Sequence, residues 1–292
     1  MLTPDQVKFY HKHGYLHIPR VFSRKAITAM REDLNWMIRV WANVGVGWTG
    51  PWREQLMDEA TAAQSQLIAM HDLHFYAESW MRGVTQTNLA GALSQLLAGP
   101  KESEGAPVEL HHTTMHVKPC ETGHPFPMHQ DYAFYPHTDS RFVDVLIHLD
   151  DTCHENGEIR FLDGSHKKGP LRHITSFVND KGEKETCTPH LNQKKYKLAD
   201  TVAVPAKAGD VVCFNINTIH GSHINTTSDM RRMVRAGYRH PQNKQKSGQS
   251  CGRPGLMVKG HRPRRRGQLL FGISGPSDTV ISQDVDAFAV KL

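Results

Sequence analysis

The sequence predicts a mainly β protein in which N-terminal helices precede a core of the jelly-roll type. Near the N-terminus, apolar residues from Ile27 to Trp41 recur at steps of three and four, as they do along one face of a helix. After residue 107 the pattern changes to short apolar runs rich in β-branched residues, such as 143–149 and 211–216. Clusters of turn-forming residues separate these runs, and short strands separated by turns are typical of a β-sandwich or barrel.

The N-terminal part, residues 1–107, is expected to be mostly helical. Thr3 can cap a first helix over residues 3–13, a short strand is expected at residues 14–19, and Ser23 can cap the next helix. Because Ser and Thr side chains accept hydrogen bonds from the first free amides of a helix, these positions define where each helix begins.

The remaining chain divides by composition. The Gly- and Trp-rich residues 43–52 break the second helix, and residues 54–98 again show a helical pattern, which we expect to form two or three helices and a possible lid. Residues 108–241 are expected to hold the jelly-roll core and residues 242–292 a basic, irregular C-terminal extension, all within a single domain over 1–292. The expected core strands are 108–118, 143–149, 158–162, 211–216 and 233–238.

Composition excludes several classes of protein. The chain has 292 residues with 38% hydrophobic and 22% charged residues, which is ordinary for a globular protein and excludes a fibrous or largely disordered chain. No apolar run approaches the roughly 20 residues of a membrane helix, and the N-terminus lacks the apolar region of a signal peptide. Five scattered cysteines without a C-x-x-C pair favour reduced thiols, so we expect a cytoplasmic protein.

The formal net charge is +6, and much of the excess lies in the basic run 259–266. Such a run can bind nucleic acid or an acidic substrate. No aromatic residues are interleaved with it to stack on bases, so we expect a solvated loop and no nucleic-acid partner.

The sequence Met128-His129-Gln130-Asp131 is the first candidate for a functional site. On a strand, side chains two residues apart point to the same face, so His129 and Asp131 would offer an imidazole and a carboxylate to one point. A second histidine is available far downstream at His220, just past an apolar strand. Two histidines and one carboxylate are the ligand set of non-heme Fe(II) oxygenases, which leaves coordination positions open.

A His-x-Asp pair is a weak signal in a chain with 20 histidines, and three such pairs occur. Asp139 of the second pair lies in a polar turn, and Asp150 of the third is followed by Asp151, which suggests a turn at a strand end. The pair His129/Asp131 instead follows a Gly- and Pro-containing loop and precedes aromatic residues suited to a pocket wall.

Arg231 lies eleven residues after His220, at the start of a strand-like run. A guanidinium binds a carboxylate in a bidentate manner, as a dicarboxylate cosubstrate requires. Ser222 can add a hydrogen bond from its hydroxyl. The alternative for Arg231 is a solvated charge at a strand start, as its neighbour Arg232 illustrates.

These residues resemble the phytanoyl-CoA dioxygenase family of Fe(II)- and 2-oxoglutarate-dependent oxygenases. The resemblance runs from residue 1 to about 241 and leaves the extension 242–292 without a counterpart. Besides the residues above, it rests on motifs in the family's order: Leu2-Thr3-Pro4-Asp5-Gln6, Val117-Lys118-Pro119, Leu149-Asp150-Asp151, Glu155-Asn156-Gly157, Gly164-Ser165-His166 and Ala208-Gly209-Asp210.

The resemblance implies a double-stranded β-helix, cupin-like core and a dioxygenase that uses Fe(II), 2-oxoglutarate and O2 and releases succinate and CO2. It places the iron ligands at His129, Asp131 and His220. It places the cosubstrate 2-oxoglutarate against Arg231 and Ser222. A further cosubstrate contact falls on His116, where some relatives have Asn.

The resemblance also bears on the reaction. Relatives that halogenate have a small residue in place of Asp131, so its carboxylate favours hydroxylation, or a related desaturation or ring closure, at an unactivated C–H bond. The substrate is expected to be a small molecule of natural-product or secondary metabolism, and the many His and Arg residues favour a polar or anionic one. Candidate pocket walls, for which core packing is the alternative, are Trp48, Trp52, Phe75, Tyr76, Trp80, Tyr132, Phe134 and Tyr135.

Three other functions are compatible with parts of this pattern. A non-catalytic, cupin-like metal-binding or sensing protein would keep the metal ligands, but it has no need of Arg231. A zinc hydrolase could use the same ligands without oxygen dependence. A nucleic-acid protein would rest on the basic run 259–266 and would show strongly salt-dependent binding.

Overall fold

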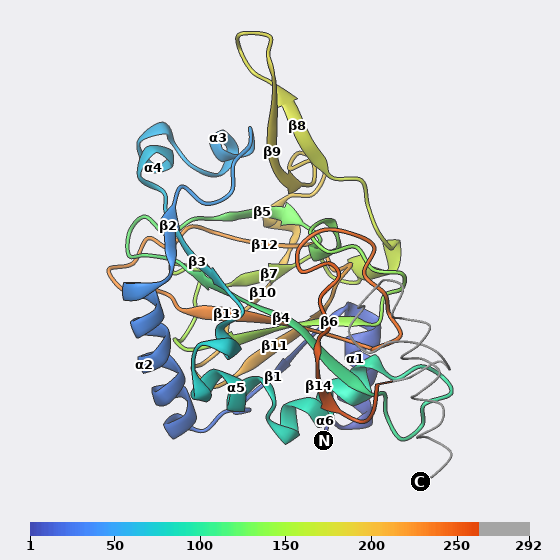
Figure 1. Ribbon diagram of the computed structural model, residues 1–292. Helices are drawn as coiled ribbons and strands as arrows, with labels where there is room; N and C mark the ends of the chain where they lie inside the picture. Colours follow the sequence, from blue (N-terminus) through green and yellow to red (C-terminus); the bar gives the residue numbers. More distant parts are fainter. Residues whose placement is uncertain (263–292) are drawn as a thin grey trace, which may run out of the picture.

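The computed structural model describes residues 1–262, which form two facing antiparallel β-sheets with helices on one side (Figure 1). In order across the large sheet, the strands are β1 (Tyr15–Ile18), β11 (Val211–Asn215), β6 (Phe142–His148), β13 (Met233–Arg239), β4 (Val108–Val117), β3 (Leu67–His71) and β2 (Asn43–Gly45), with β14 (Leu256–Lys259) against β4. The small sheet consists of β10 (Val202–Val204), β7 (Ile159–Phe161), β12 (His220–Ser222) and β5 (Phe126–His129). This is the predicted jelly-roll core.

The central strand β6 shows why its sequence is almost continuously apolar. Val143, Val145 and Ile147 pack in the cluster shared with the helices, whereas Leu146 packs between the sheets with Ile159. Both faces of the strand are therefore covered, and alternation of polar and apolar residues is lost.

Four helices cover the outer face of the large sheet: α1 (Pro4–His13), α2 (Arg24–Val40), α5 (Glu78–Val84) and α6 (Thr87–Leu97). As predicted, Thr3 caps α1 and Ser23 caps α2 through hydrogen bonds to backbone amides. Leu34 and Met37 of α2 are fully buried against the sheet, in agreement with the predicted spacing. Two short helices, α3 (Arg53–Leu56) and α4 (Glu59–Gln64), lie beside the small sheet.

Two expectations about local structure are wrong. Within 54–98, expected to be helical, Leu67–His71 forms β3, because pairing with β4 satisfies its backbone and buries its apolar side chains. The extension, expected to be irregular, adds β14 to the end of β4. The protruding hairpin of β8 (Ile174–Val178) and β9 (Lys184–His190), seen at the top of Figure 1, was not predicted either.

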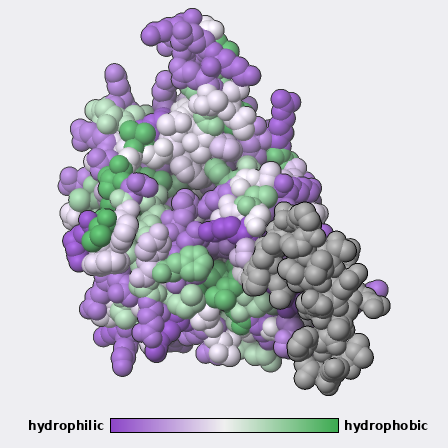
Figure 2. Space-filling model, in the orientation of Figure 1, coloured by the Kyte–Doolittle hydropathy of each residue, from purple (hydrophilic) through white to green (hydrophobic). Residues whose placement is uncertain are grey.

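The face seen in Figure 2 is largely hydrophilic, with only limited apolar patches. Within residues 1–262, no helix has the length and apolar character needed to cross a membrane. All five cysteines fall in this described part and are unpaired, as expected. Of the basic run 259–266, positions 263–266 lie outside the described residues.

Candidate metal centre

Neighbouring strands of the small sheet bring the two candidate histidine ligands together. His129 ends β5 and His220 begins β12, and these two residues face each other in the register of the two strands. Asp131 lies just beyond β5, in a 3₁₀ turn over Asp131–Ala133 rather than on the strand itself. Because Gln130 keeps an extended backbone, with φ of −117° and ψ of 137°, Asp131 still projects to the same face as His129.

The ligand atoms converge on one point. His129 Nε2 lies 3.5 Å and His220 Nε2 lies 3.9 Å from Asp131 Oδ1, and all three residues are buried. Neither carboxylate oxygen of Asp131 makes a hydrogen bond, although Arg235 Nη1 lies 2.8 Å from Oδ1 as an ion-pair partner. Buried polar atoms without partners are uncommon, and here they fit a site that a cation completes.

Backbone carbonyls set the tautomers of both histidines. His129 Nδ1 lies 2.7 Å from the Pro127 carbonyl, and His220 Nδ1 lies 3.0 Å from the Thr218 carbonyl. A carbonyl can only accept, so each Nδ1 carries the proton and each Nε2 presents a lone pair toward Asp131. These carbonyls also fix the ring orientation, as partners of metal-binding histidines commonly do.

The electrostatics keep the ligands in the protonation states that a metal requires. Burial raises the pKa of Asp131, but the charge of Arg235 outweighs it and holds this pKa well below its usual range. Burial and the neighbouring His129 lower the pKa of His220 to about 3, so it is neutral at pH 7. One carboxylate and two imidazoles form a ligand set that suits Fe(II).

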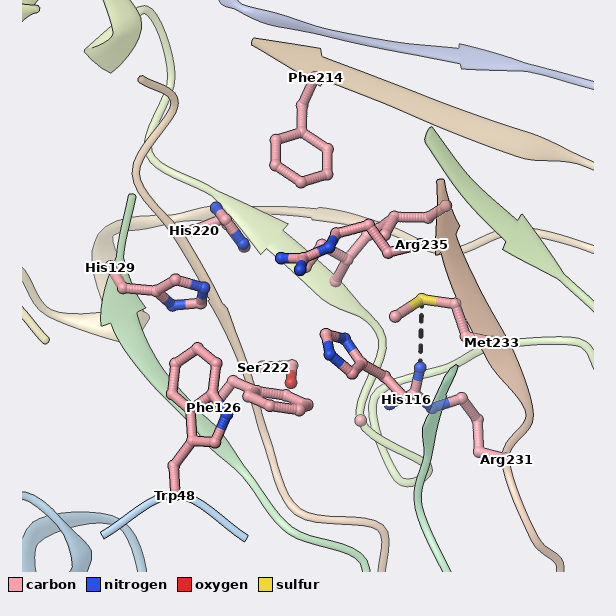
Figure 3. A pocket seen from close by; sticks show the side chains of 13 residues that line it. Trp48, His116, Phe126, His129, Phe214, His220, Ser222, Arg231, Met233 and Arg235 are labelled. Carbon is pink, nitrogen blue, oxygen red and sulfur yellow. Dashed lines mark hydrogen bonds between the residues drawn. The ribbon is translucent and has the colours of Figure 1, made fainter. Parts of the chain in front are cut away.

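Arg231 lies close to these ligands and has an unsatisfied guanidinium. It is buried, and Nη1 contacts only the sulfur of Met233 at 3.2 Å, whereas Nε and Nη2 have no hydrogen-bond partner. Burial lowers its pKa to about 10, which leaves it charged at pH 7. A buried cation with free donors, facing the pocket of the metal centre, is suited to a carboxylate (Figure 3).

Ser222 and His116 line the same pocket as Arg231 and the two histidines (Figure 3). Ser222 Oγ accepts a hydrogen bond of 2.8 Å from Lys118 Nζ, which leaves the hydroxyl proton free to donate. Burial and the charge of Arg235 lower the pKa of His116 well below its usual range, so it is neutral. Five of the six sequence-predicted site residues therefore line one pocket, and the sixth, Asp131, lies against the two histidines among them.

The other His-x-Asp pairs have structural partners instead. Asp139 pairs with Arg141 at 3.0 Å, and Asp150 pairs with Arg232 at 2.8 Å. Neither carboxylate meets a second histidine within the described chain in a group able to hold a metal.

The candidate pocket walls divide into three groups. Trp48 lines the metal-centre pocket, with its ring centroid 4.7 Å from that of His129, and Phe134 lies 4.8 Å from Trp48. Core packing is the correct interpretation for the fully buried Trp52, Trp80 and Tyr135 and for Tyr132, which packs partly buried against the cluster of Tyr135. Phe75 and Tyr76 are exposed, away from the pocket.

Two residues near the site are not among the site residues predicted from the sequence. Arg235 Nη1 lies 2.8 Å from Asp131 Oδ1, and Lys118 is fully buried beside Ser222. Arg231 lies two residues before Met233, the first residue of β13, and Arg235 two residues after it, so period-two alternation could have indicated that Arg235 shares the face of Arg231.

Comparisons with known proteins identify the family of this chain. A model of the family described as phytanoyl-CoA dioxygenase matches residues 10–233. A probable alpha-ketoglutarate-dependent hypophosphite dioxygenase from Stutzerimonas stutzeri is 26% identical over 238 residues, which cover 80% of this chain and 77% of the relative. An L-proline trans-4-hydroxylase from Streptomyces griseoviridis is 25% identical over 250 residues, which cover 80% of this chain and 85% of the relative.

Among solved structures, the non-heme alpha ketoglutarate dependent carbocyclase SnoK from nogalamycin biosynthesis has a TM-score of 0.64 at 22% identity, covering 89% of this chain and 94% of its own. This likeness confirms the predicted fold. The relatives are enzymes, so the non-catalytic alternative finds no support. The chain belongs to the phytanoyl-CoA dioxygenase family of Fe(II)- and 2-oxoglutarate-dependent oxygenases.

Proposed function

We propose that this protein hydroxylates an unactivated C–H bond of a polar or anionic small molecule, with His129, Asp131 and His220 as the iron ligands. The convergence of these three buried side chains, with Nε2 of both histidines within 3.9 Å of Asp131 Oδ1, carries the proposal. Because a carboxylate occupies position 131, we propose hydroxylation and not halogenation. We also propose a cytoplasmic location, which the unpaired cysteines support.

Arg231, Ser222 and His116 are proposed to bind 2-oxoglutarate. Arg231 offers two buried nitrogens without partners, which would bind the distal carboxylate in a bidentate manner. Lys118 occupies a lone pair of Ser222 Oγ, so the hydroxyl is oriented to donate to the same carboxylate. Neutral His116, on β4, would complete the wall of the 2-oxoglutarate pocket.

When bound, Fe(II) and 2-oxoglutarate supply the oxidant that removes a hydrogen atom from the substrate. The protein's part is to hold the reactants and exclude water. Trp48 lies against His129 and Phe126, with ring centroids 4.7 and 5.0 Å apart, and so covers the ligands with an apolar surface. Arg235 holds Asp131 as a carboxylate oriented toward the two histidines.

The first test compares succinate formation by wild type and His129→Ala after anaerobic reconstitution with Fe(II), followed by 2-oxoglutarate and O2. We expect slow succinate release from wild type even without substrate. We expect a loss of more than about 100-fold in the variant, because removing a ligand exceeds the 10–100-fold effect of removing a ligand's partner. Exposed His11, replaced by Ala, is the matched control and should behave as wild type.

Three outcomes of this test differ in meaning. Wild-type Fe(II) protein that fails to bind 2-oxoglutarate would contradict the proposed function. Equal succinate formation by wild type and His129→Ala would contradict the ligand assignment alone. Activity with Zn(II) and without O2 would favour a hydrolase.

A second prediction concerns Arg231→Met, which keeps a long side chain but removes the charge. We expect the dissociation constant of 2-oxoglutarate to rise by roughly 30-fold or more, since loss of one partner of a buried charge pair costs about 2–5 kcal/mol. Arg232→Met, next to it but paired with Asp150, should leave this constant unchanged. Titration of the Fe(II) protein with 2-oxoglutarate under nitrogen measures both, and equal effects of the two substitutions would exclude Arg231 as the binding residue.

A further inference from the structure

A cavity of about 380 Å³ lies beside the metal centre, and Trp48, His116 and Arg235 line both this cavity and the metal-centre pocket. Its volume falls at the small end of the roughly 300–1,000 Å³ typical of small-molecule sites. The aromatic Trp48 forms the boundary between the cavity and the histidine ligands. A molecule held in the cavity would therefore lie next to the centre of the chemistry.

Arg235 is the one charged side chain among the described residues that line the cavity, and no carboxylate lines it. The residue is only 5% exposed, and its Nε has no hydrogen-bond partner. Its nearest counterion is Asp131. A metal ion at Asp131 would share this negative charge, so the positive charge of Arg235 would be less compensated in the loaded enzyme.

The charge of Arg235 also affects the pKa values of the histidines around the cavity. After burial, it is the main cause that lowers the pKa of both His71 and His116, so both rings are neutral at pH 7. The cavity thus combines one buried cation with neutral polar groups, an arrangement that favours an anion.

The C-terminal extension supplies the outer wall of the cavity through Gln249. Its backbone amide donates to the Phe134 carbonyl at 2.9 Å, and its side-chain Nε2 donates to His71 Nδ1 at 2.8 Å. Gln245 Nε2 donates to the Gln249 carbonyl at 2.6 Å. Gly248 has φ of +87°, and a Cβ there would collide with the Phe134 carbonyl, so only glycine permits this close approach.

Arg235 and Gln249 both lie beyond residues 10–233, the part that the family model matches. We propose that this cavity binds the substrate through a carboxylate group, with Arg235 as its charged contact and Gln249 of the extension as a specificity-determining contact. Arg235 Nη1 faces Asp131 and Nη2 lies 3.4 Å from His112 Nε2, so Nε is the charged donor that remains for this carboxylate. This inference rests on the proposed function, because the substrate must face the metal centre.

The test uses two probes of the same shape, cyclohexanecarboxylate and the uncharged cyclohexanecarboxamide. Full-length protein is loaded anaerobically with Fe(II) and saturating 2-oxoglutarate, so that Arg231 is already engaged, and binding is measured by calorimetry. We expect wild type to bind the acid about tenfold or more tightly than the amide, with an affinity for the acid alone that falls as salt is added.

Gln249→Glu places a negative charge in the wall without changing the size of the side chain. We expect it to weaken binding of the acid roughly tenfold through charge repulsion and to leave binding of the amide within about twofold. Gln242→Glu, an exposed position in the same extension outside the cavity, is the matched control and should change neither affinity.

Equal binding of acid and amide by wild type would overturn the proposal, as would failure of the acid to bind at about 10 mM. An unchanged preference in Gln249→Glu would overturn the part assigned to Gln249. Failure of the Fe(II) protein to bind 2-oxoglutarate is visible before either probe is added, and it would contradict the proposed function instead.

Discussion

Among single residues, His148 differs from the other buried histidines because its ring has no polar partner. It is fully buried at the end of β6, and neither ring nitrogen makes a hydrogen bond. Burial, followed by the charge of Arg231, lowers its pKa to about 3. An unsatisfied buried polar group destabilises a fold by about 1–3 kcal/mol, so replacing the side chain of His148 can stabilise the protein.

We therefore predict that His148→Leu increases the free energy of unfolding by about 1 kcal/mol at pH 7, because an apolar side chain of similar volume needs no partner. Urea denaturation measures this change. His137→Leu is the matched control. His137 is also buried, but its Nδ1 donates a hydrogen bond to the Tyr135 carbonyl at 2.6 Å, so loss of this bond should lower the free energy of unfolding. Equal destabilisation by both substitutions would show that the unpaired nitrogens of His148 carry no penalty.

Among elements, β14 shows how the extension is attached to the core. Its residues pair with the start of β4, and Arg262 just beyond it forms an ion pair with the fully buried Glu109. Glu109 also binds Arg239 of β13 at 2.6 Å, so one carboxylate joins the extension to the large sheet. Close approach is possible because Gly255 precedes β14, where a Cβ would collide with the Leu110 carbonyl.

We predict that Gly255→Ala destabilises the protein by about 1–3 kcal/mol, the usual effect of forcing extra volume into a packed site. Amides of residues 256–259 should exchange hydrogen faster, because β14 must move away from β4. Gly91→Ala in α6, where a Cβ meets nothing within 4 Å, is the matched control and should stabilise by roughly 0.5–1 kcal/mol. Unchanged exchange over 256–259 would contradict this account of β14.

At the scale of the whole molecule, several histidines are buried in the neutral form. Burial is the main cause that lowers the pKa of His111, His124 and His148 to about 3 and that of His137 to about 4. In the unfolded chain these groups titrate near their ordinary value of about 6.5. Below that pH the unfolded state binds more protons than the folded state, so acidification favours unfolding.

The protein is therefore predicted to lose stability as the pH falls from about 6.5 toward 4. Each such histidine contributes up to about 1.4 kcal/mol per pH unit to the slope of the free energy of unfolding against pH. Urea midpoints of the metal-free protein at several pH values test this, and His148→Leu should reduce the slope by one histidine. A midpoint that stays constant from pH 7 to 5 would contradict the prediction.

The order of elements and the proposed ligand positions could be predicted because they depend on local patterns. The caps Thr3 and Ser23 and the apolar run of β6 correspond to the observed structure. Leu67–His71 was assigned to a helix because a short apolar run has no periodicity of its own, and only pairing with β4 makes it a strand.

The fold class, the helix starts and the residue types of the site can be read from the amino-acid sequence, since they follow from side-chain periodicity, capping and spacing within short segments. Only the tertiary structure decided which His-x-Asp pair meets another histidine, because this depends on the register that sets His220 opposite His129. It also decided that Arg235 contacts Asp131 and that Gln249 closes the neighbouring cavity. Contacts between segments far apart in the chain depend on how sheets pack and pair, and no local pattern encodes that packing.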